Sequence, residues 1–156
     1  MIEPVYEIND WISADSKWIN LVGSDNVFYP AQEDPKSGFP HVQYNSRIQV
    51  WPDDYWMYLV QVSYAMYFDS VKDSADAMNI ILQKIKTGDT SAQRLNKWIE
   101  QRAATNADYD PVYEFHSFDS IYGGTVDPNQ ERGGAMARTL SFTVICSALS
   151  GVGIDI

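Results

Sequence analysis

Strict alternation of apolar and polar residues marks two neighbouring segments in the first half of the chain. Over residues 42–50 the even-numbered positions are mostly apolar and the odd-numbered positions are polar. Residues 55–68 have an apolar or aromatic side chain at every even position, while their other face mixes Met57 and Leu59 with Gln61 and Ser63. A two-residue period predicts strands with one buried face. The short turn Pro52-Asp53-Asp54 between the segments predicts an antiparallel hairpin.

A period of three to four residues replaces this alternation in two helical segments before residue 86. Val5, Ile8 and Ile12 predict a short N-terminal helix over residues 4–12, and Pro4 is tolerated in its first turn. The second segment has a single apolar stripe formed by Val71, Ala75, Met78, Leu82 and Ile85. This stripe predicts a helix that begins after a cap at Asp69 or Ser70 and ends before Gly88.

A further helix is expected from a capping-box pattern at Thr90-Ser91-Ala92-Gln93. One side of this helix would present Leu95, Trp98, Ile99 and Arg102. Asn106 to Pro111 then predicts a turn. Residues 23–40 contain three prolines and two glycines, so they predict a loop with one short extended piece at residues 27–29.

Two strands are expected near the end of the chain. Tyr113, Phe115 and Ile121 alternate with polar residues, and residues 139–148 alternate again. A long polar loop over residues 123–134 separates them, with a doubled glycine at each base that would provide hinges. The whole pattern predicts one α+β domain over residues 1–156. Its four-stranded antiparallel sheet is flanked by helices in the order α-β-β-α-α-β-β.

The net charge of the chain indicates which classes of binding partner are unfavourable. The formal net charge is −10, which disfavours proteins that bind nucleic acids or anionic membranes. Residues 69–105 are the exception, with six basic against five acidic residues. No apolar run approaches the roughly 20 residues needed to cross a bilayer, and the start of the chain has no secretory-signal pattern. We therefore expect a soluble protein of a cytoplasm-like compartment, without membrane partners.

Catalytic patterns are missing from the sequence. The two histidines, His41 and His116, lack the spacing of a zinc motif, and Cys146 lies in an apolar run that predicts a buried, inert thiol. Glu114 and His116 share a predicted strand face, but one such pair is common by chance. Phosphate-binding, dinucleotide-binding and nucleophile-elbow motifs are also absent. The sequence predicts a protein without catalytic activity, metal or cofactor.

The order of these elements resembles the tail terminator, or tail-completion, proteins of long-tailed bacteriophages. An N-terminal helix leads to a Pro-rich loop that ends in Phe39-Pro40-His41-Val42-Gln43-Tyr44, followed by the strand Tyr58-Leu59-Val60-Gln61-Val62-Ser63-Tyr64. A helix begins at Asp69-Ser70-Val71, and the chain closes with a Gly-rich loop and the strand Ala137-Arg138-Thr139-Leu140-Ser141-Phe142-Thr143-Val144. The resemblance covers nearly the whole chain and rests on the order of the elements.

This resemblance implies a structural virion protein, assembled in the host cytoplasm and located in the neck of the tail. Such proteins form a hexameric ring on the last ring of the tail tube, so copies of this chain, the tube protein and the head-side connector protein are the expected partners. DNA would pass through an acidic lumen without specific binding. The expected subunit or tube contacts lie in the 123–134 loop, at Thr125, Asp127, Asn129, Gln130, Glu131 and Arg132.

Two other functions remain open at the level of sequence. The chain could be another component of the phage neck or head–tail connector, which a different ring symmetry would reveal. It could also be a small-ligand-binding or enzymatic α+β domain, with Glu114 and His116 in a pocket. A deep pocket at those two residues would favour the latter function.

Overall fold

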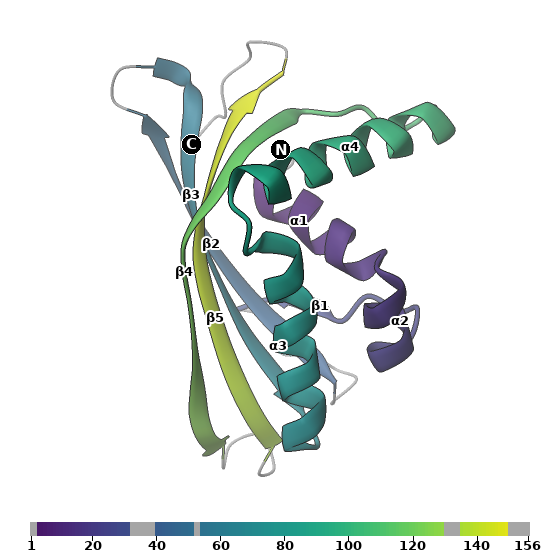
Figure 1. Ribbon diagram of the computed structural model, residues 1–156, viewed down its shortest axis with the longest axis vertical. Coiled ribbons are helices and arrows are strands. Elements are labelled where there is room, and N and C mark those ends of the chain that lie inside the picture. Colours follow the sequence, from purple (N-terminus) through teal and green to yellow (C-terminus); the bar gives the residue numbers. More distant parts are fainter. Residues whose placement is uncertain (1–2, 32–39, 52–53, 130–134, 150–156) are drawn as a thin grey trace.

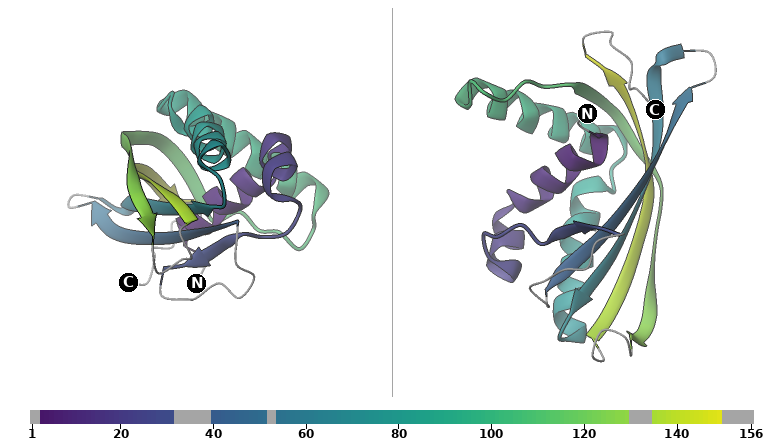
Figure 2. Two further views of the ribbon diagram at one scale, coloured as in Figure 1. Left: turned by 90° about the horizontal axis from the view of Figure 1, so that it is seen from below. Right: turned by 180° about the vertical axis from the view of Figure 1, so that it is seen from behind.

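A single twisted sheet with all its helices on one face forms the described part of the molecule (Figure 1). The computed structural model describes residues 3–31, 40–51, 54–129 and 135–149. Figure 2 shows these two layers from below and from behind, and no described helix covers the other face of the sheet. The predicted α+β class is confirmed. The observed order is α-α-β-β-β-α-α-β-β, so the predicted order lacked one helix and one strand.

The predicted N-terminal helix is present as α1 (Pro4–Ser13), and its apolar stripe is fully buried. A second helix, α2 (Ser16–Val22), follows at once and was not predicted. The Asp15 carboxylate caps it by accepting hydrogen bonds from the backbone N–H groups of Lys17 (2.8 Å) and Trp18 (3.4 Å). This helix has only seven residues, so it is too short to show a repeated apolar stripe in the sequence.

Trp18 fixes α2 against the first strand of the sheet. Its indole ring is buried and stacks on Phe28, with 5.6 Å between ring centroids. Phe28 begins β1 (Phe28–Pro30), a three-residue strand that pairs in parallel with β2 (His41–Trp51). The short extended piece predicted at residues 27–29 is therefore part of the sheet. The sheet is a mixed one of five strands, where four antiparallel strands were predicted.

The predicted hairpin is confirmed as β2 and β3 (Asp54–Phe68), which pair in antiparallel from His41↔Tyr67 to Trp51↔Asp54. The even-numbered residues of β3 from Tyr58 to Phe68 are all buried under the helices, as their alternation predicts. β3 pairs on its other side with β5 (Ala135–Ala148), so it lies in the centre of the sheet. The sheet order is β1-β2-β3-β5-β4.

Helix α3 (Val71–Ile85) covers the middle of the sheet, and its buried face differs slightly from the predicted one. The fully buried positions are Ser74, Ala77, Ile81 and Ile85, whereas Met78 and Leu82 are only partly buried. Val71, assigned to the stripe, is 51% exposed. The stripe was therefore placed about one residue off, because apolar residues on this helix cover more than one face. The Ser70 cap is confirmed, since its hydroxyl accepts from the Asp73 N–H at 3.1 Å.

Helix α4 (Asp89–Thr105) presents the predicted apolar side, but the capping box predicted at its start is wrong. Its N-cap is Gly88, which has a φ of 56° and no side chain to act as a cap. The Ser91 hydroxyl instead accepts from the Thr87 N–H (3.1 Å), closing the tight α3–α4 connection. Leu95 and Ile99 are buried in the core.

Strand β4 (Tyr113–Asn129) is longer and less regular than predicted. Three register shifts interrupt its pairing with β5, and Ser120 has a φ of 52°. Phe118 is consequently buried, while Ile121, the residue predicted for that face, is only partly buried. Bulges of this kind cannot be recognised from a two-residue alternation. The sequence pattern therefore assigned Ile121 to the buried face in place of Phe118.

The prediction of a long loop over residues 123–134 is wrong for residues 123–129. Residues 123–129 continue β4 and pair with β5, including Gly123↔Leu140 and Asn129↔Ala135. Gly123 has a packing role, because a Cβ there would lie 2.9 Å from Met78 Cε of α3. Residues 130–134 lie outside the described residues.

Candidate functional site

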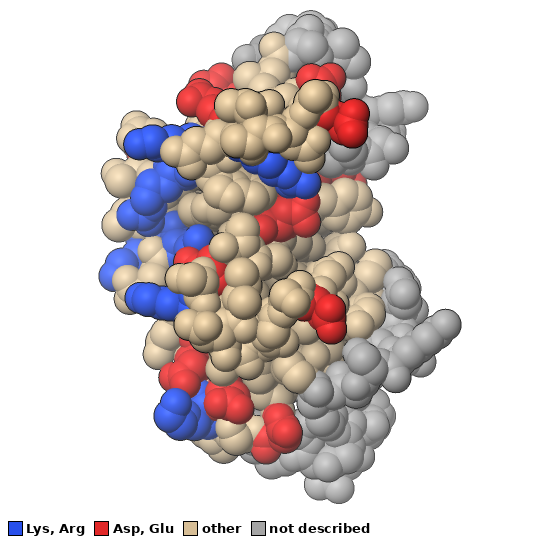
Figure 3. Space-filling model, turned by 90° about the vertical axis from the view of Figure 1, so that its right-hand side faces the viewer, with Lys and Arg blue, Asp and Glu red and all other residues tan. Residues whose placement is uncertain are grey.

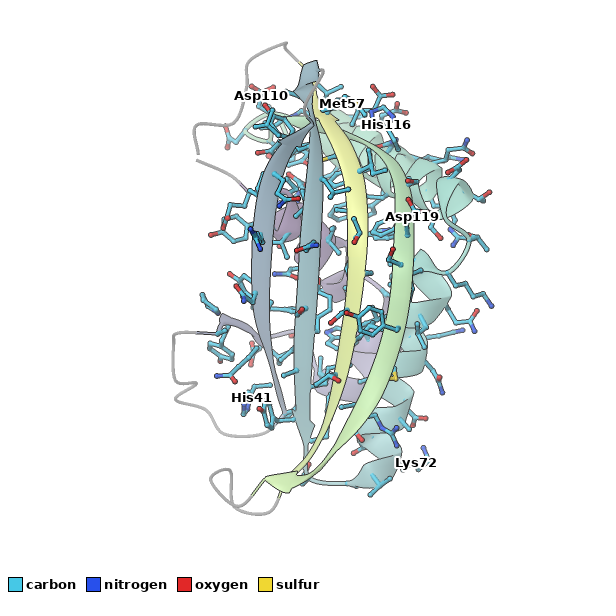
Figure 4. The ribbon with its side chains drawn as sticks, turned by 90° about the vertical axis from the view of Figure 1, so that its left-hand side faces the viewer. His41, Met57, Lys72, Asp110, His116 and Asp119 are labelled. Atoms are coloured by element: carbon cyan, nitrogen blue, oxygen red, sulfur yellow. The ribbon has the colours of Figure 1, made fainter. Side chains whose placement is uncertain are left out.

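The residues predicted to contact other subunits fall at one end of the β4–β5 pair. Thr125, Asp127 and Asn129 belong to β4, and their backbone continues the ladder instead of forming a separate loop. Gln130, Glu131 and Arg132 lie outside the described residues. This end of the sheet is far along the strand from His116 and Asp119, which Figure 4 shows nearer the other end of β4.

The candidate acid–base pair does not form a site. Glu114 and His116 are both exposed on β4, and His116 Nε2 lies 2.8 Å from the Ser147 hydroxyl of β5. The small pocket that includes Glu114 is lined partly by Asn96, Pro111 and Leu149, and His116 is not part of it. The second histidine, His41, lies near the opposite end of the sheet (Figure 4). Among the described residues, no group of three or more His, Cys, Asp or Glu side chains could hold a metal ion.

His41 and Cys146 are both core residues. The His41 imidazole is buried and stacks on the Tyr67 ring, with 4.8 Å between centroids. Cys146 is fully buried on β5, and burial raises the pKa of its thiol to about 12. The prediction that this thiol is buried is therefore confirmed.

A buried acid that sequence analysis missed joins the N-terminal helix to the far end of α4. The Glu7 carboxylate of α1 is buried, and its Oε2 accepts a hydrogen bond of 2.6 Å from the Tyr109 hydroxyl. Arg102 pairs with Asp10 at 3.0 Å and lies 3.8 Å from Glu7. Its guanidinium also covers the Tyr109 ring, 4.1 Å from the centroid.

These contacts set the ionisation of both groups. Burial raises the pKa of Glu7, and the hydrogen bond from Tyr109 and the charge of Arg102 only partly oppose this effect. Burial and the neighbouring Glu7 carboxylate raise the pKa of Tyr109 well above its ordinary value. Each polar side chain of this cluster has a hydrogen-bond or ion-pair partner within it. The cluster therefore holds α1, α4 and the turn before β4 together. Glu7 follows Val5 and Tyr6 in an amphipathic helix, where an acid normally indicates the solvent side.

A hollow with a volume of about 690 Å³ lies between α2 and α3. Trp11, Leu21 and Ile80 give it apolar walls, and Lys17, Lys84 and Arg94 are its cations. These residues come from all four helices, so no local sequence pattern could have indicated them. We call this hollow the α2–α3 groove.

Lys84 lies in the wall of the α2–α3 groove and has partners within the chain. Its Nζ pairs with Asp15 Oδ2 at 3.0 Å and lies 4.5 Å from the centroid of the Trp11 ring. Burial alone would raise the pKa of Asp15, but the hydrogen bond and charge of Lys84 lower it below its ordinary value. Arg94 directs Nη2 onto the carbonyl oxygens of Gln83 and Lys84 at the end of α3. Lys17 makes no ion pair with any described residue.

The uncovered sheet face carries few charges for so acidic a chain. Its β3 and β5 positions include Gln61, Ser63, Ser141 and Thr143, and the hydroxyls of Ser63 and Ser141 lie 3.2 Å apart. Figure 4 shows this face, with His116 and Asp119 along the β4 side. We call this surface the open sheet face.

The acidic residues of β4 and the basic residues of α3 and α4 lie on two different surfaces. Strand β4 and the turn before it, residues 106–129, contain five acidic residues and no Lys or Arg. Figure 3 shows the opposite, helical side, where Lys and Arg side chains form a column along one margin. Lys84, Lys86, Arg94 and Lys97 lie consecutively on α3, α4 and their connection. The basic segment predicted from sequence is therefore part of the helical layer.

Both margins of the sheet leave backbone unpaired among the described residues. β1 pairs only with Val42 to Tyr44, so the remaining outer edge of β2 has no described strand beside it. β4 is the last strand on the other side. At Phe115 the side-chain amide of Asn96 occupies that edge, donating to the Phe115 carbonyl and accepting from the Phe115 N–H. Unpaired edges of this length are sites at which another chain can add.

Comparisons with known proteins assign no family to this arrangement. No family model matches the chain, and neither the curated proteins nor the solved structures contain a match. Within the described ranges, none of the helices has the length and apolar character needed to span a membrane.

Proposed function

We propose that this chain is a structural virion protein, a bacteriophage tail terminator whose copies form a ring on the end of the tail tube. The observation that carries this proposal is the pair of unlike, unpaired margins of one sheet. β2 is open beyond Tyr44 on one side, and β4 is open over most of its length on the other. Two different edges on one chain favour a head-to-tail contact, which closes into a ring when the rotation between copies allows.

The open sheet face supports the same proposal. Most of its residues are polar, with Leu59 and Ile145 among them. Its carboxylates Glu114 and Asp119 lie on β4, and Arg47 of β2 is a cation on the same face. The parts of this face that border the lumen of the ring would present hydroxyls, amides and some negative charge to the passing genome. Such a surface does not hold phosphate groups, because tight binding to nucleic acid needs clustered Lys and Arg.

The proposed ring also fits the chemistry of the described side chains. Glu114 and His116 share no pocket, and the buried acid Glu7 is held by Tyr109 and Arg102 within the core. The proposed function is association through surfaces, and the partners would be further copies, the tube protein and the head-side connector protein. Residues 125–132, at one end of the β4–β5 pair, stay the proposed contact with a neighbouring copy or the tube.

Deletion of the gene for this chain tests the proposal in the phage that carries it. A terminator stops the polymerisation of the tube, so its loss should give tails of irregular, excessive length that fail to join heads. Supplying the wild-type chain should restore tails of uniform length. Normal tails on headless particles would instead indicate a head-side connector component, and unchanged virions would contradict any role in the tail.

A further inference from the structure

The α2–α3 groove has the chemistry of a binding site for an anionic segment that bears an apolar side chain. Its walls combine Trp11, Leu21 and Ile80 with cations. The two acids of the groove already have partners, Asp15 in Lys84 and Asp76 in Lys72. Lys17, by contrast, makes no ion pair with a described residue. The four hydrogen bonds that Arg94 makes to described residues all come from Nη2, which leaves the outer side of the guanidinium for a ligand.

One exposed feature of the same chain matches this groove. Tyr122 of β4 is 69% exposed, more than any other large apolar side chain that the structure describes. It lies on the open sheet face, because it pairs with Ser141, and Asp119 lies on the same face through its pairing with Thr143. An aromatic ring beside a carboxylate is the kind of anchor that protein interfaces bury.

The charges determine which surfaces can meet. The segment around Tyr122 belongs to residues 106–129, which carry carboxylates and no cation. If this surface met its own copy in a symmetric dimer, like charges would face each other. The helical layer around the groove instead offers Lys17, Arg94 and the nearby Lys97. Opposite charges therefore favour a head-to-tail contact between two different surfaces.

We propose that the α2–α3 groove of one copy receives Tyr122 of the next copy, with Asp119 of that copy facing Lys17 and Arg94. This inference rests on the proposed ring and specifies the surfaces that build it. The groove is lined by residues of the helical layer and Tyr122 lies on the opposite sheet face, so each copy offers one of each. A dimer formed by this contact still has one empty groove and one unbound Tyr122 surface, so further copies can add to it.

Disulfide trapping between two singly substituted chains tests this contact. Asn79→Cys places a thiol in the groove, and Ser141→Cys places one on the opposing surface, opposite Tyr122 on β5, without removing the Tyr122 ring. The native Cys146 is fully buried and does not compete. Mixed under mild oxidation, the two variants should form the mixed disulfide at least about tenfold faster than Asn79→Cys mixed with Leu149→Cys. Leu149 is a matched control because it is 51% exposed and lies outside the groove.

The chain carrying both Asn79→Cys and Ser141→Cys should form a ladder of cross-linked oligomers. Trapping is irreversible, so it accumulates product even where the free copies associate only briefly. Equal rates for the two mixtures, or a preference for the Asn79→Cys homodimer, would overturn the proposed contact. Uniform tail lengths in the complementation experiment, together with equal trapping rates, would leave the terminator function standing and reject only these surfaces.

Discussion

Asn96 and Phe115 are joined by two hydrogen bonds of 2.8 Å, in which the side-chain amide of α4 binds both backbone groups of an edge-strand residue. Asn96 Nδ2 donates to the Phe115 carbonyl, and the Phe115 N–H donates to Asn96 Oδ1. The amide thus takes the place of a neighbouring strand at the first register shift of β4. The Asn96 amide occupies one point of the outer edge of β4 and joins α4 to the sheet.

Replacement of Asn96 by Ala should lower the free energy of unfolding by about 1–3 kcal/mol, because both backbone groups lose their partner in a partly buried place. Asn96→Asp keeps the acceptor and loses the donor, so it should also destabilise the fold. Chemical denaturation measured by circular dichroism checks the change. Lys97→Ala, at the exposed neighbouring position of α4, serves as control and should stay within about 0.5 kcal/mol of wild type. An unchanged midpoint for Asn96→Ala would show that water replaces the amide at no cost.

The buried Glu7 should make stability depend on pH. Its pKa in the folded state lies above the ordinary value of 4.5, chiefly because of burial. A carboxyl group with a raised folded pKa supports the fold fully below the unfolded pKa, and this contribution is lost as the pH rises through the folded pKa. Glu7→Gln removes the titration and keeps an acceptor for Tyr109.

The stability of Glu7→Gln relative to wild type should therefore improve as the pH rises from about 4 to 7. Thermal unfolding at a series of pH values measures this difference. Asp25→Asn, which changes an exposed carboxylate, is the control and should give a smaller dependence. A difference that is constant with pH, or that moves in favour of wild type, would show that the Arg102 pair outweighs burial.

The buried face of α3 predicts unequal costs for two adjacent truncations. Ile81 is fully buried, and Leu82 is only partly buried against the same core. Ile81→Ala should cost about 2–5 kcal/mol, whereas Leu82→Ala should cost clearly less. Denaturation of the two variants under one set of conditions compares them directly. A larger loss for Leu82→Ala would restore the stripe that the sequence alone predicted.

Cys146 should react with thiol reagents only when the core opens. It is buried on β5 next to the central strand, and its pKa is raised to about 12. Labelling by an aromatic disulfide reagent should be far slower than for free cysteine, and should accelerate with denaturant in step with unfolding. Fast labelling of the native protein, with a rate independent of denaturant, would contradict this burial.

The hairpin and the helices with clear apolar stripes could be predicted from sequence, because their periods are set by one buried face. The even-numbered residues of β3 show this best, since all those from Tyr58 to Phe68 lie under helices. Shorter elements could not be found in this way. α2 is fixed by the Asp15 cap and by the stack of Trp18 on Phe28, neither of which repeats along the chain.

The surfaces of the proposed contact were harder to predict than the core. The α2–α3 groove draws on residues as distant as Trp11 and Arg94, so only the fold brings them together. β4 was cut short in the prediction because Gly123 and Gly124 are typical of loops. In the structure, Gly123 makes room for Met78 within a paired strand. Its role is close packing, which local sequence cannot distinguish from a hinge.

The most direct test of the central proposal is electron microscopy of intact virions that carry this chain, with the density of the neck reconstructed without imposed symmetry. A tail terminator should appear as one closed ring of six copies between the head-proximal end of the tube and the connector. Within that ring, the groove between α2 and α3 should face β4 of the next copy. A twelve-fold ring on the head side, or a virion without this chain, would contradict the proposal.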